Sequence, residues 1–293
     1  MHNSVKLILL LSACLVMQFS FAQSFSEAPN VANGKPISKI VEWVDEGDNN
    51  KAEKGLTYLF DEKGKLLYFE NGDKKHMAIW AYDEKDRLET VVETEGELTT
   101  KQSITYRKKS REVLLSYRTR DYKTIDFFDA KNRKVESKVY IRGEDVGPKW
   151  VIKDRKVYNY DSRDSLFGEM YYSYQMKGGG PKVLKRKTIH TFAGADHRKV
   201  KSVFYDFDQT ERIVTDYIYD SKGVLQSISE KDMEEEELTI TDFKYKNGKP
   251  WQEIKTVGNF KSVKIYKDDL LIRTRNYLDG KILNVIDYQY FYF

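Results

Sequence analysis

Cysteine, proline and histidine are scarce in this chain of 293 residues, which has one Cys, five Pro and four His. The one cysteine, Cys14, lies in the N-terminal leader described below, so the remaining chain has none. Disulfide bridges, a cysteine nucleophile and thiolate metal ligands are therefore excluded from the mature protein. Its stability has to come from packing and backbone pairing.

An excess of one charge sign is also missing. The chain has 50 basic and 46 acidic residues, and removal of the leader with Lys6 leaves 49 against 46, a net charge of +3. This balance is too weak and too mixed to indicate a nucleic-acid partner. A charged fraction of 33% and a mean hydropathy of -0.67 argue against a polytopic helical membrane protein. With 40% hydrophobic and 14% aromatic residues, the composition is that of a folded chain.

The N-terminus reads as a secretory signal over residues 1–22. Lys6 precedes the apolar stretch Leu7 to Met17, and Ser20-Phe21-Ala22 places small residues before a cleavage site at Gln23. A helix of that stretch would be about 16 Å long, too short for a hydrocarbon core of about 30 Å, so no transmembrane helix is expected after cleavage. Lipidation at Cys14 is the alternative, and it is less favoured because the apolar stretch continues past Cys14. The protein is expected in the periplasm, at the outer membrane or outside the cell.

A short motif recurs along the chain: an aromatic residue, an Asp or Lys, two polar residues, then Gly, Asn or Asp and a new aliphatic run. It is seen in YLFDEKGKLLYFE, AYDEKDRLETVVE, TYRKKSREVLLSY, FFDAKNRKVESKVY, NYDSRDSLFGEMYY, DFDQTERIVTDYIY, IYDSKGVLQSISE, KYKNGKPWQEIKTV, IYKDDLLIRTRNY and NYLDGKILNVIDY. The pattern is typical of a β-hairpin. Its Asp opens a type I turn, and Gly, Asn or Asp takes the left-handed position. We expect these paired roles at Asp61 and Gly64, Asp129 and Asn132, Asp161 and Asp164, and Asp220 and Gly223.

The spacing of the motif predicts an all-β fold. Many gaps between successive turn-entry aromatics, a set taken to include Phe192 and Phe207, lie near multiples of 11 residues, one strand plus one tight turn. We expect an antiparallel meander of about 18–20 strands in one domain, residues 23–293, forming an elongated, twisted or partly closed sheet. Residues 37–47 are expected as a strand. The Gly- and Pro-containing stretches 143–150 and 176–187 are expected as long loops.

These units resemble YD repeats of the Rhs type, with Tyr219-Asp220-Ser221-Lys222-Gly223 as the best match. The C-terminal segments YKNGKPWQE and NYLDGKILN also resemble MORN-variant hairpin repeats. The resemblance runs from about Tyr58 to the end, through short and degenerate units; Tyr106, for example, is followed by Arg107. It implies a β-hairpin array and supplies no catalytic residue, because the repeats of those families are structural.

No segment carries a recognisable catalytic, cofactor or metal motif. His190 and His197 lack a third ligand at motif spacing, and these two and His76 are expected as exposed loop residues. Gly178 to Gly180 lacks the ending of a phosphate-binding loop. Glu234 to Glu237 lacks the pattern of a calcium loop and reads as a solvated hairpin tip. Lys185 to Lys187 reads as a solvated strand or loop rather than a polyanion site.

The C-terminus YQYFYF resembles the closing strand of an outer-membrane barrel. Against that interpretation, SITYRKKSREVLLSYRTRDYKT places charge on both faces of its strands within a few residues. The favoured function is a non-enzymatic binding or scaffolding protein of the cell envelope or exterior, whose partner would be an extended protein or glycan. Two alternatives stay open: an outer-membrane β-barrel, and a hydrolase built on a pair of carboxylates.

Overall fold

The computed structural model describes residues 31–32, 35–46, 52–144, 146–175 and 182–292. All regular structure in this part is β-strand. The strands are β1 Val31–Ala32, β2 Lys35–Asp45, β3 Glu53–Phe60, β4 Leu66–Glu70, β5 His76–Tyr82, β6 Leu88–Glu95, β7 Leu98–Arg107, β8 Ser110–Tyr117, β9 Arg120–Phe128, β10 Lys134–Gly143, β11 Gly147–Tyr160, β12 Leu166–Gln175, β13 Lys182–Ala193, β14 Arg198–Tyr205, β15 Glu211–Tyr219, β16 Leu225–Asp232, β17 Leu238–Lys246, β18 Lys249–Val257, β19 Phe260–Lys267, β20 Leu270–Leu278 and β21 Lys281–Tyr292.

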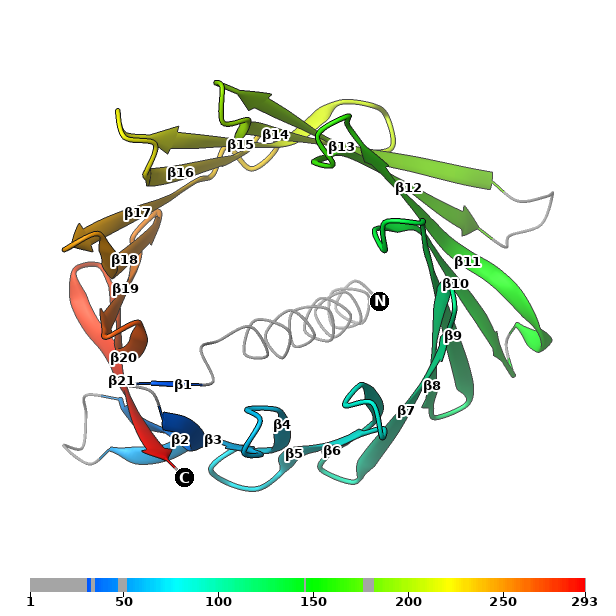
Figure 1. Ribbon diagram of the computed structural model, residues 1–293, viewed down its shortest axis with the longest axis horizontal. Helices are drawn as coiled ribbons and strands as arrows, with labels where there is room; N and C mark the ends of the chain where they lie inside the picture. The colour runs from blue at the N-terminus through cyan, green and yellow to red at the C-terminus, as the bar shows by residue number, and fades with distance from the viewer. Residues whose placement is uncertain (1–30, 33–34, 47–51, 145, 176–181, 293) are drawn as a thin grey trace.

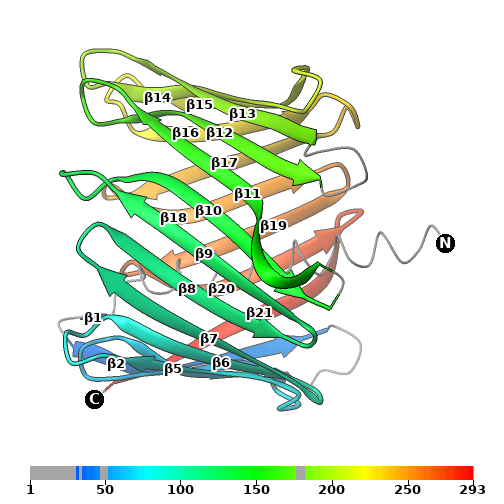
Figure 2. The same cartoon turned by 90° about the vertical axis from the view of Figure 1, so that its right-hand side faces the viewer.

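Strands β2 to β21 form a closed antiparallel barrel of 20 strands (Figure 1). Each strand pairs with its neighbours in the sequence, and the ring closes because β2 pairs with both β3 and β21. The closing register runs from Ile37 opposite Tyr292 to Asp45 opposite Val285. The meander and the strand number predicted from the sequence are therefore confirmed. The expectation of an elongated or partly closed sheet is wrong, since no open edge remains. Figure 2 shows the tilted wall from the side.

The predicted hairpin turns have the predicted geometry. Gly64 has φ 78°, Asn132 61°, Asp164 65° and Gly223 82°, so all four occupy the left-handed region. In the turn that opens at Asp129, one carboxylate oxygen accepts the backbone N–H groups of Lys131 and Arg133, each at 2.9 Å. One turn was misplaced by a residue. Asp206, not Asp208, follows the last strand residue, Tyr205, so Phe207 lies inside the turn.

Register shifts accompany most of the turn-entry aromatics. The ladder slips by one residue at Phe60, Tyr82, Tyr160, Phe192, Tyr205, Tyr219, Tyr245, Tyr266 and Tyr277. A β-bulge bends its strand and increases the local twist. Repeated around the sheet, these bulges supply the curvature that brings β21 back to β2.

The two faces of the sheet differ in exposure. In β17 the alternate residues Thr239, Thr241, Phe243 and Tyr245 are half-buried, whereas Leu238, Ile240, Asp242 and Lys244 are exposed. Side chains converge on the concave side of a closed sheet and diverge on the convex side. The half-buried residues of β17 therefore point to the inner face. Residues directly opposite each other on paired strands share a face, so the registers assign the inner and outer residues of the other strands in turn. Ile79 and Ile218, which are 50% and 52% exposed, belong to the outer face.

The best-packed region lies where the ring closes. Ile40, Tyr58, Phe60, Leu66 and Leu270 form a buried cluster. Tyr288 and Tyr290 of β21 pack against this cluster from the other side of the β2–β21 junction. The short strand β1 pairs with the start of β2 and lies inside the ring (Figure 1). Hydrophobic packing thus supports the pairing between the first and last strands of the barrel.

Three local expectations have mixed outcomes. Residues 37–47 form a strand as predicted, to Asp45. The long loop expected at 143–150 is instead a tight hairpin, because β11 begins at Gly147. The expected loop 176–187 is strand from Lys182 onward, and its first part lies outside the described residues. Within the described residues, no helix is long and apolar enough to cross a membrane.

Candidate functional site

The barrel has two rims of different construction. We call rim A the edge formed by the hairpin turns that follow the odd-numbered strands β3 to β19, and rim B the edge formed by the turns that follow the even-numbered strands. The Asp-opened turns 61–65, 83–87, 129–133, 161–165 and 220–224 all lie on rim A. The turn 206–210 has the same backbone hydrogen bonds but follows β14, on rim B, so the Asp-opened turns are concentrated on rim A without being confined to it.

Tyrosine hydroxyls connect five of the rim A hairpins to the one before, and Tyr290 of β21 makes the same bond. The Tyr82 hydroxyl donates to the carbonyl oxygen of Leu66, at 2.9 Å, and Leu66 is the first residue after the preceding turn. The same bond joins Tyr106 to Leu88, Tyr160 to Lys134, Tyr219 to Lys199, Tyr245 to Leu225 and Tyr290 to Leu271. This contact explains why tyrosine recurs at turn entry.

The basic residue that follows the left-handed turn position lies over the next tyrosine ring. The Arg87 guanidinium is 4.4 Å from the ring centre of Tyr106, and the Arg133 guanidinium is 4.6 Å from that of Tyr160. Lys65 over Tyr82 and Arg198 over Tyr219 repeat the arrangement. Such contacts contribute about 0.5–1 kcal/mol each at exposed sites. The aromatic and basic positions of the motif thus form one lateral contact between units.

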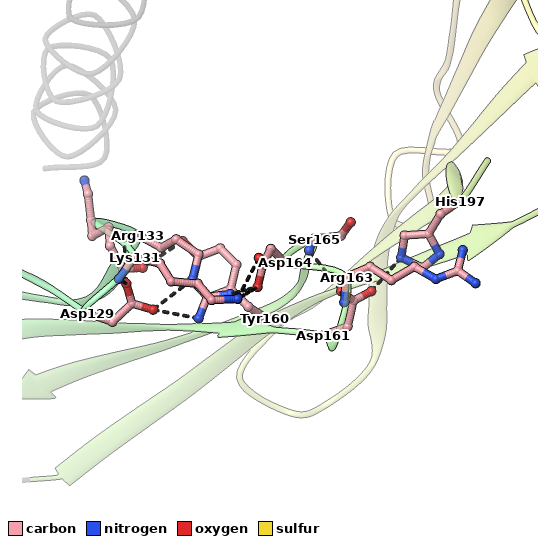
Figure 3. A network of polar contacts seen from close by, with 10 residues as sticks. Asp129, Lys131, Arg133, Tyr160, Asp161, Arg163, Asp164, Ser165 and His197 are labelled. Carbon is pink, nitrogen blue, oxygen red and sulfur yellow. Dashed lines mark hydrogen bonds and ion pairs between the residues drawn. The ribbon is translucent and has the colours of Figure 1, made fainter.

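Ion pairs join neighbouring turns on rim A (Figure 3). Lys131 Nζ lies 2.7 Å and Arg133 Nη1 2.6 Å from the carboxylate of Asp164 in the next turn. Asp161 of that same turn lies 2.6 Å from Nε2 of His197 in the following one. Hydrogen bonds from the backbone and side chain of Arg133 hold the pKa of Asp129 below its ordinary value. The network fixes successive hairpins relative to one another.

The inner face is rich in aromatic side chains. Residues that share it include Tyr82, Tyr122, Tyr158, Tyr217, Phe243 and Tyr288. Barrels of 16–18 strands already leave an aqueous channel. With strands about 4.8 Å apart and tilted by about 40°, a ring of 20 strands is about 40 Å across between backbones. The aromatic face therefore lines an open lumen.

Acidic groups on the inner face have partners. Asp126 is 3% exposed and lies 2.6 Å from Nη2 of Arg111. The Tyr171 hydroxyl donates to Asp154 at 2.7 Å. Glu42 accepts a hydrogen bond from Tyr58; burial raises the pKa of Glu42 to about 7, and this bond offsets the rise only in part. These contacts make the inner face polar but locally neutral.

The outer face carries ion pairs in the wall and near rim B. Arg155 Nε lies 2.5 Å from Glu136 in the wall, and Arg142 Nη2 lies 2.7 Å from Asp121 at the rim B end of β9 and β10. Arg273 forms two hydrogen bonds to Asp287 beside the β2–β21 junction. Trp150 is contacted by two cations, with Lys123 Nζ 4.6 Å and the Arg142 guanidinium 4.5 Å from its ring. Charged groups thus alternate with apolar residues along the outer wall.

The residues considered as sites in the sequence are dispersed. His76 and His190 are half-buried strand residues, bonded to Glu93 and Ser202, so the expectation of exposed loop histidines is wrong for both. His197 lies in a turn of rim A. Lys185 to Lys187 lies in β13, and Glu234 to Glu237 forms the tip between β16 and β17 as predicted.

Gly178 to Gly180 lies outside the described residues. Among the residues that are described, no group of three or more His, Cys, Asp or Glu is placed to hold a metal ion.

Comparisons with known proteins give only distant similarities. No protein-family model and no curated protein matches the chain. A crystal structure of a porin-like protein from Bacteroides uniformis ATCC 8492 is 10% identical, with a TM-score of 0.36 over 88% of this chain and 97% of that one. The TcdB2-TccC3-Cdc42 structure is 12% identical, with a TM-score of 0.33 over 80% of this chain and 16% of that one. The proposals below therefore rest on the geometry of this chain.

Aromatic rings recur on every strand or two of the inner face, and the hydrogen-bonding groups between them are mostly already paired. Sequence reasoning identified the aromatic and Asp positions. It missed the register shifts in the strand ladders and the inward placement of the tyrosines, although the alternation of residues in β17 signals a two-faced sheet.

Proposed function

We propose that this chain is an exported, water-filled β-barrel that binds one elongated polymer, a polypeptide or a glycan, in its aromatic lumen. The observation that carries the proposal is the division of side chains between the two faces of a closed ring. Aromatic residues concentrate on the inner face, whereas the ion pairs Arg155–Glu136 and Arg273–Asp287 within the wall face outward.

Aromatic surfaces bind extended polymers through many modest contacts. Tyrosine offers a large, rigid apolar face together with a hydroxyl, and aromatic residues are enriched among the positions that dominate binding energy. Half-buried rings such as Tyr122 and Tyr217 keep part of their surface accessible. Neither hydroxyl bonds to another described group, so both are available to a ligand. Positively and negatively charged side chains are mixed on the lumen wall, so the affinity for a ligand should depend little on salt concentration.

The test compares inner-face and outer-face variants. Fluorescently labelled probes, one an unfolded, reduced and carboxymethylated polypeptide and one a linear cellulose oligosaccharide, are titrated with the mature protein and followed by anisotropy. Tyr122→Ala with Tyr217→Ala should weaken binding of the preferred probe by about tenfold. The outer-face pair Tyr140→Ala with Tyr172→Ala should leave it unchanged. Equal losses in both pairs, or no binding of either probe, would overturn the proposal.

An outer-membrane β-barrel is the second candidate, and ring closure is the observation that favours it. A chain that crosses a bilayer by strands has to close, because unpaired backbone groups are not tolerated in hydrocarbon. Closure thus supports this candidate over the open scaffold expected from the sequence. The outer-face charges weigh against it, since a Lys or Arg on the lipid face costs about 2–4 kcal/mol at the midplane.

Membrane insertion is tested by expression with the leader and fractionation of the cells. The water-filled barrel predicts that the mature protein is released without detergent and migrates identically in electrophoresis with and without heating. A strict detergent requirement with heat-modifiable migration would instead establish the outer-membrane barrel.

A further inference from the structure

Rim A carries an excess of unpaired positive charge. Within its turns, five exposed basic side chains have no hydrogen-bond or ion-pair partner in the described structure: Lys85, Lys108, Lys109, Arg163 and Lys222. Three more stand at its strand ends, Arg107, Lys246 and Lys267. The acids on the same rim without a Lys or Arg partner are Asp61, Glu62, Glu84, Asp161, Asp220 and Asp268. Lys63 and Lys65 share the single carboxylate of Asp86, which adds one more positive charge. Eight free cations against six such acids, together with this shared pair, leave rim A positive.

Rim B has the opposite sign. Its exposed acids without a side-chain partner among the described residues are Glu46, Glu53, Glu95, Glu97, Glu144, Glu235, Glu236 and Glu237. Its free cations are Lys74, Lys281 and Arg118, and the last lies over the ring of Tyr117. Eight free anions against three free cations make the described part of rim B negative. The small net charge of the chain therefore conceals a barrel whose two ends differ in sign.

We propose that rim A of one copy docks on rim B of a second copy, so that barrels associate head to tail. The two rims belong to the same ring of 20 strands and so have matched circumferences, with opposite charge. Such a contact joins two different surfaces of the same chain, and it adds copies in an open stack unless a rotation closes it. The lumens of stacked copies would be continuous. This inference does not depend on what the lumen binds.

The association should be controlled by ionic strength. Exposed charges interact over a Debye length of about 10 Å at 0.1 M salt, and that length falls to about 3 Å at 1 M. The complementarity between the rims is electrostatic, so the association should weaken as the salt concentration rises, whereas the exposed Met233, Leu278 and Ile282 of rim B add apolar surface that salt does not screen. Sedimentation velocity of the mature protein should show concentration-dependent assemblies at low ionic strength and markedly smaller ones at high ionic strength.

Charge reversal tests the docking directly. One variant carries Lys108→Glu, Lys109→Glu and Lys222→Glu on rim A, and another carries Glu235→Lys, Glu236→Lys and Glu237→Lys on rim B. Each alone should associate at least tenfold more weakly than the unmodified chain in low salt. An equimolar mixture should recover association, because the unchanged rim A of the second variant meets the unchanged rim B of the first.

A wall variant with Lys101→Glu, Lys185→Glu and Lys201→Glu is the matched control. It makes the same change in net charge as the rim A variant, at exposed outer-face positions within the strands rather than in the rim turns, and should still associate. Circular dichroism and melting temperature confirm that every variant folds. An unmodified chain that stays monomeric in low salt, a wall variant that is equally weakened, or a mixture that fails to recover would each overturn the proposal.

Discussion

The hydroxyl of a turn-entry tyrosine reaches the preceding hairpin, which a phenylalanine at the same position cannot do. Tyr160 donates to the Lys134 carbonyl at 2.8 Å. Loss of one such bond costs about 0.5–1.5 kcal/mol. Tyr160→Phe should therefore lower the free energy of unfolding by about that amount, measured by urea denaturation. The control is Tyr217→Phe, since the Tyr217 hydroxyl bonds to no other described group. Equal effects of the two substitutions would contradict the bracing role.

Gly223 is constrained by its backbone and by its neighbour. Its φ of 82° disfavours any β-branched residue, and an added Cβ would meet the guanidinium of Arg198. Gly223→Val should destabilise the protein by about 1–2 kcal/mol. Gly223→Asn should cost clearly less, because Asn tolerates the left-handed region.

Gly248 allows the effect of the positive φ at Gly223 to be measured separately from the effect of the contact with Arg198. Gly248 has a similar φ of 78° and nothing near its Cβ position, so Gly248→Asn reports the backbone term alone. Gly223→Asn should lower the free energy of unfolding more than Gly248→Asn does, because only the side chain at position 223 displaces Arg198 from the ring of Tyr219. If Val and Asn have equal effects at position 223, the assigned turn geometry is wrong.

Glu42 couples the stability of the closing junction to pH. Burial raises its pKa to about 7, so between about pH 4.5 and 7 the folded state binds a proton that the unfolded state has released. Stability should fall as pH rises through this window. Glu42→Gln should remove that part of the pH dependence and be the more stable form at pH 8. Melting temperatures across pH 5–8 check this, and parallel curves for both proteins would contradict it.

Among the elements, the Asp-opened hairpins give a pH dependence of the opposite sign. The pKa values of Asp83 and Asp129 are held low by hydrogen bonds from Arg87 and Arg133. The stability that these two carboxylates contribute to the folded state is complete above about pH 4, the ordinary pKa of an aspartate, and is lost as the pH falls below that value. Asp83→Asn with Asp129→Asn should reduce the drop in melting temperature between pH 5 and pH 3. An undiminished drop would show that these turns are not responsible.

The hairpin turns were also the elements that the sequence predicted best. Asp, Gly and Asn at fixed offsets encode a local geometry, and the structure has it at Gly64, Asn132, Asp164 and Gly223. The register shifts at Tyr82 and its equivalents were not predicted, because they lie in the strand ladder and occur beside Phe60 and Phe192 as well as beside tyrosines. The loop expected at 143–150 was wrong because Gly147 and Pro148 belong to the bulged first part of β11, where strand pairing overrides their turn preference.

At the scale of the whole molecule, ring closure left one local mark in the sequence: the aromatic C-terminus resembles the closing strand of an outer-membrane barrel. That signal was set aside because of the charges on both faces of other strands. Residues 37–47 were predicted as a strand, but the sequence does not indicate that this strand pairs with the C-terminal one. Ring closure is set by the summed curvature of all the bulged hairpins. The site was less predictable still, because the aromatic lumen exists only once the ring has closed.

The most direct test of the account is a disulfide across the junction that closes the ring. The chain has no cysteine besides Cys14, and Val41 lies opposite Gln289 in the β2–β21 register. Directly opposed residues of antiparallel strands have Cα atoms about 4.5–5.5 Å apart, within the range that a disulfide spans. Val41→Cys with Gln289→Cys should oxidise to an intramolecular disulfide, detected by mass spectrometry, without a change in circular dichroism.

The control pair is Val41→Cys with Met170→Cys, because β12 lies on the opposite side of the ring from β2 (Figure 1). The closed barrel predicts an intramolecular disulfide in the first pair only. A folded protein in which Cys at 41 and 289 stay reduced, or link no faster than the control pair, would show that the ring is open.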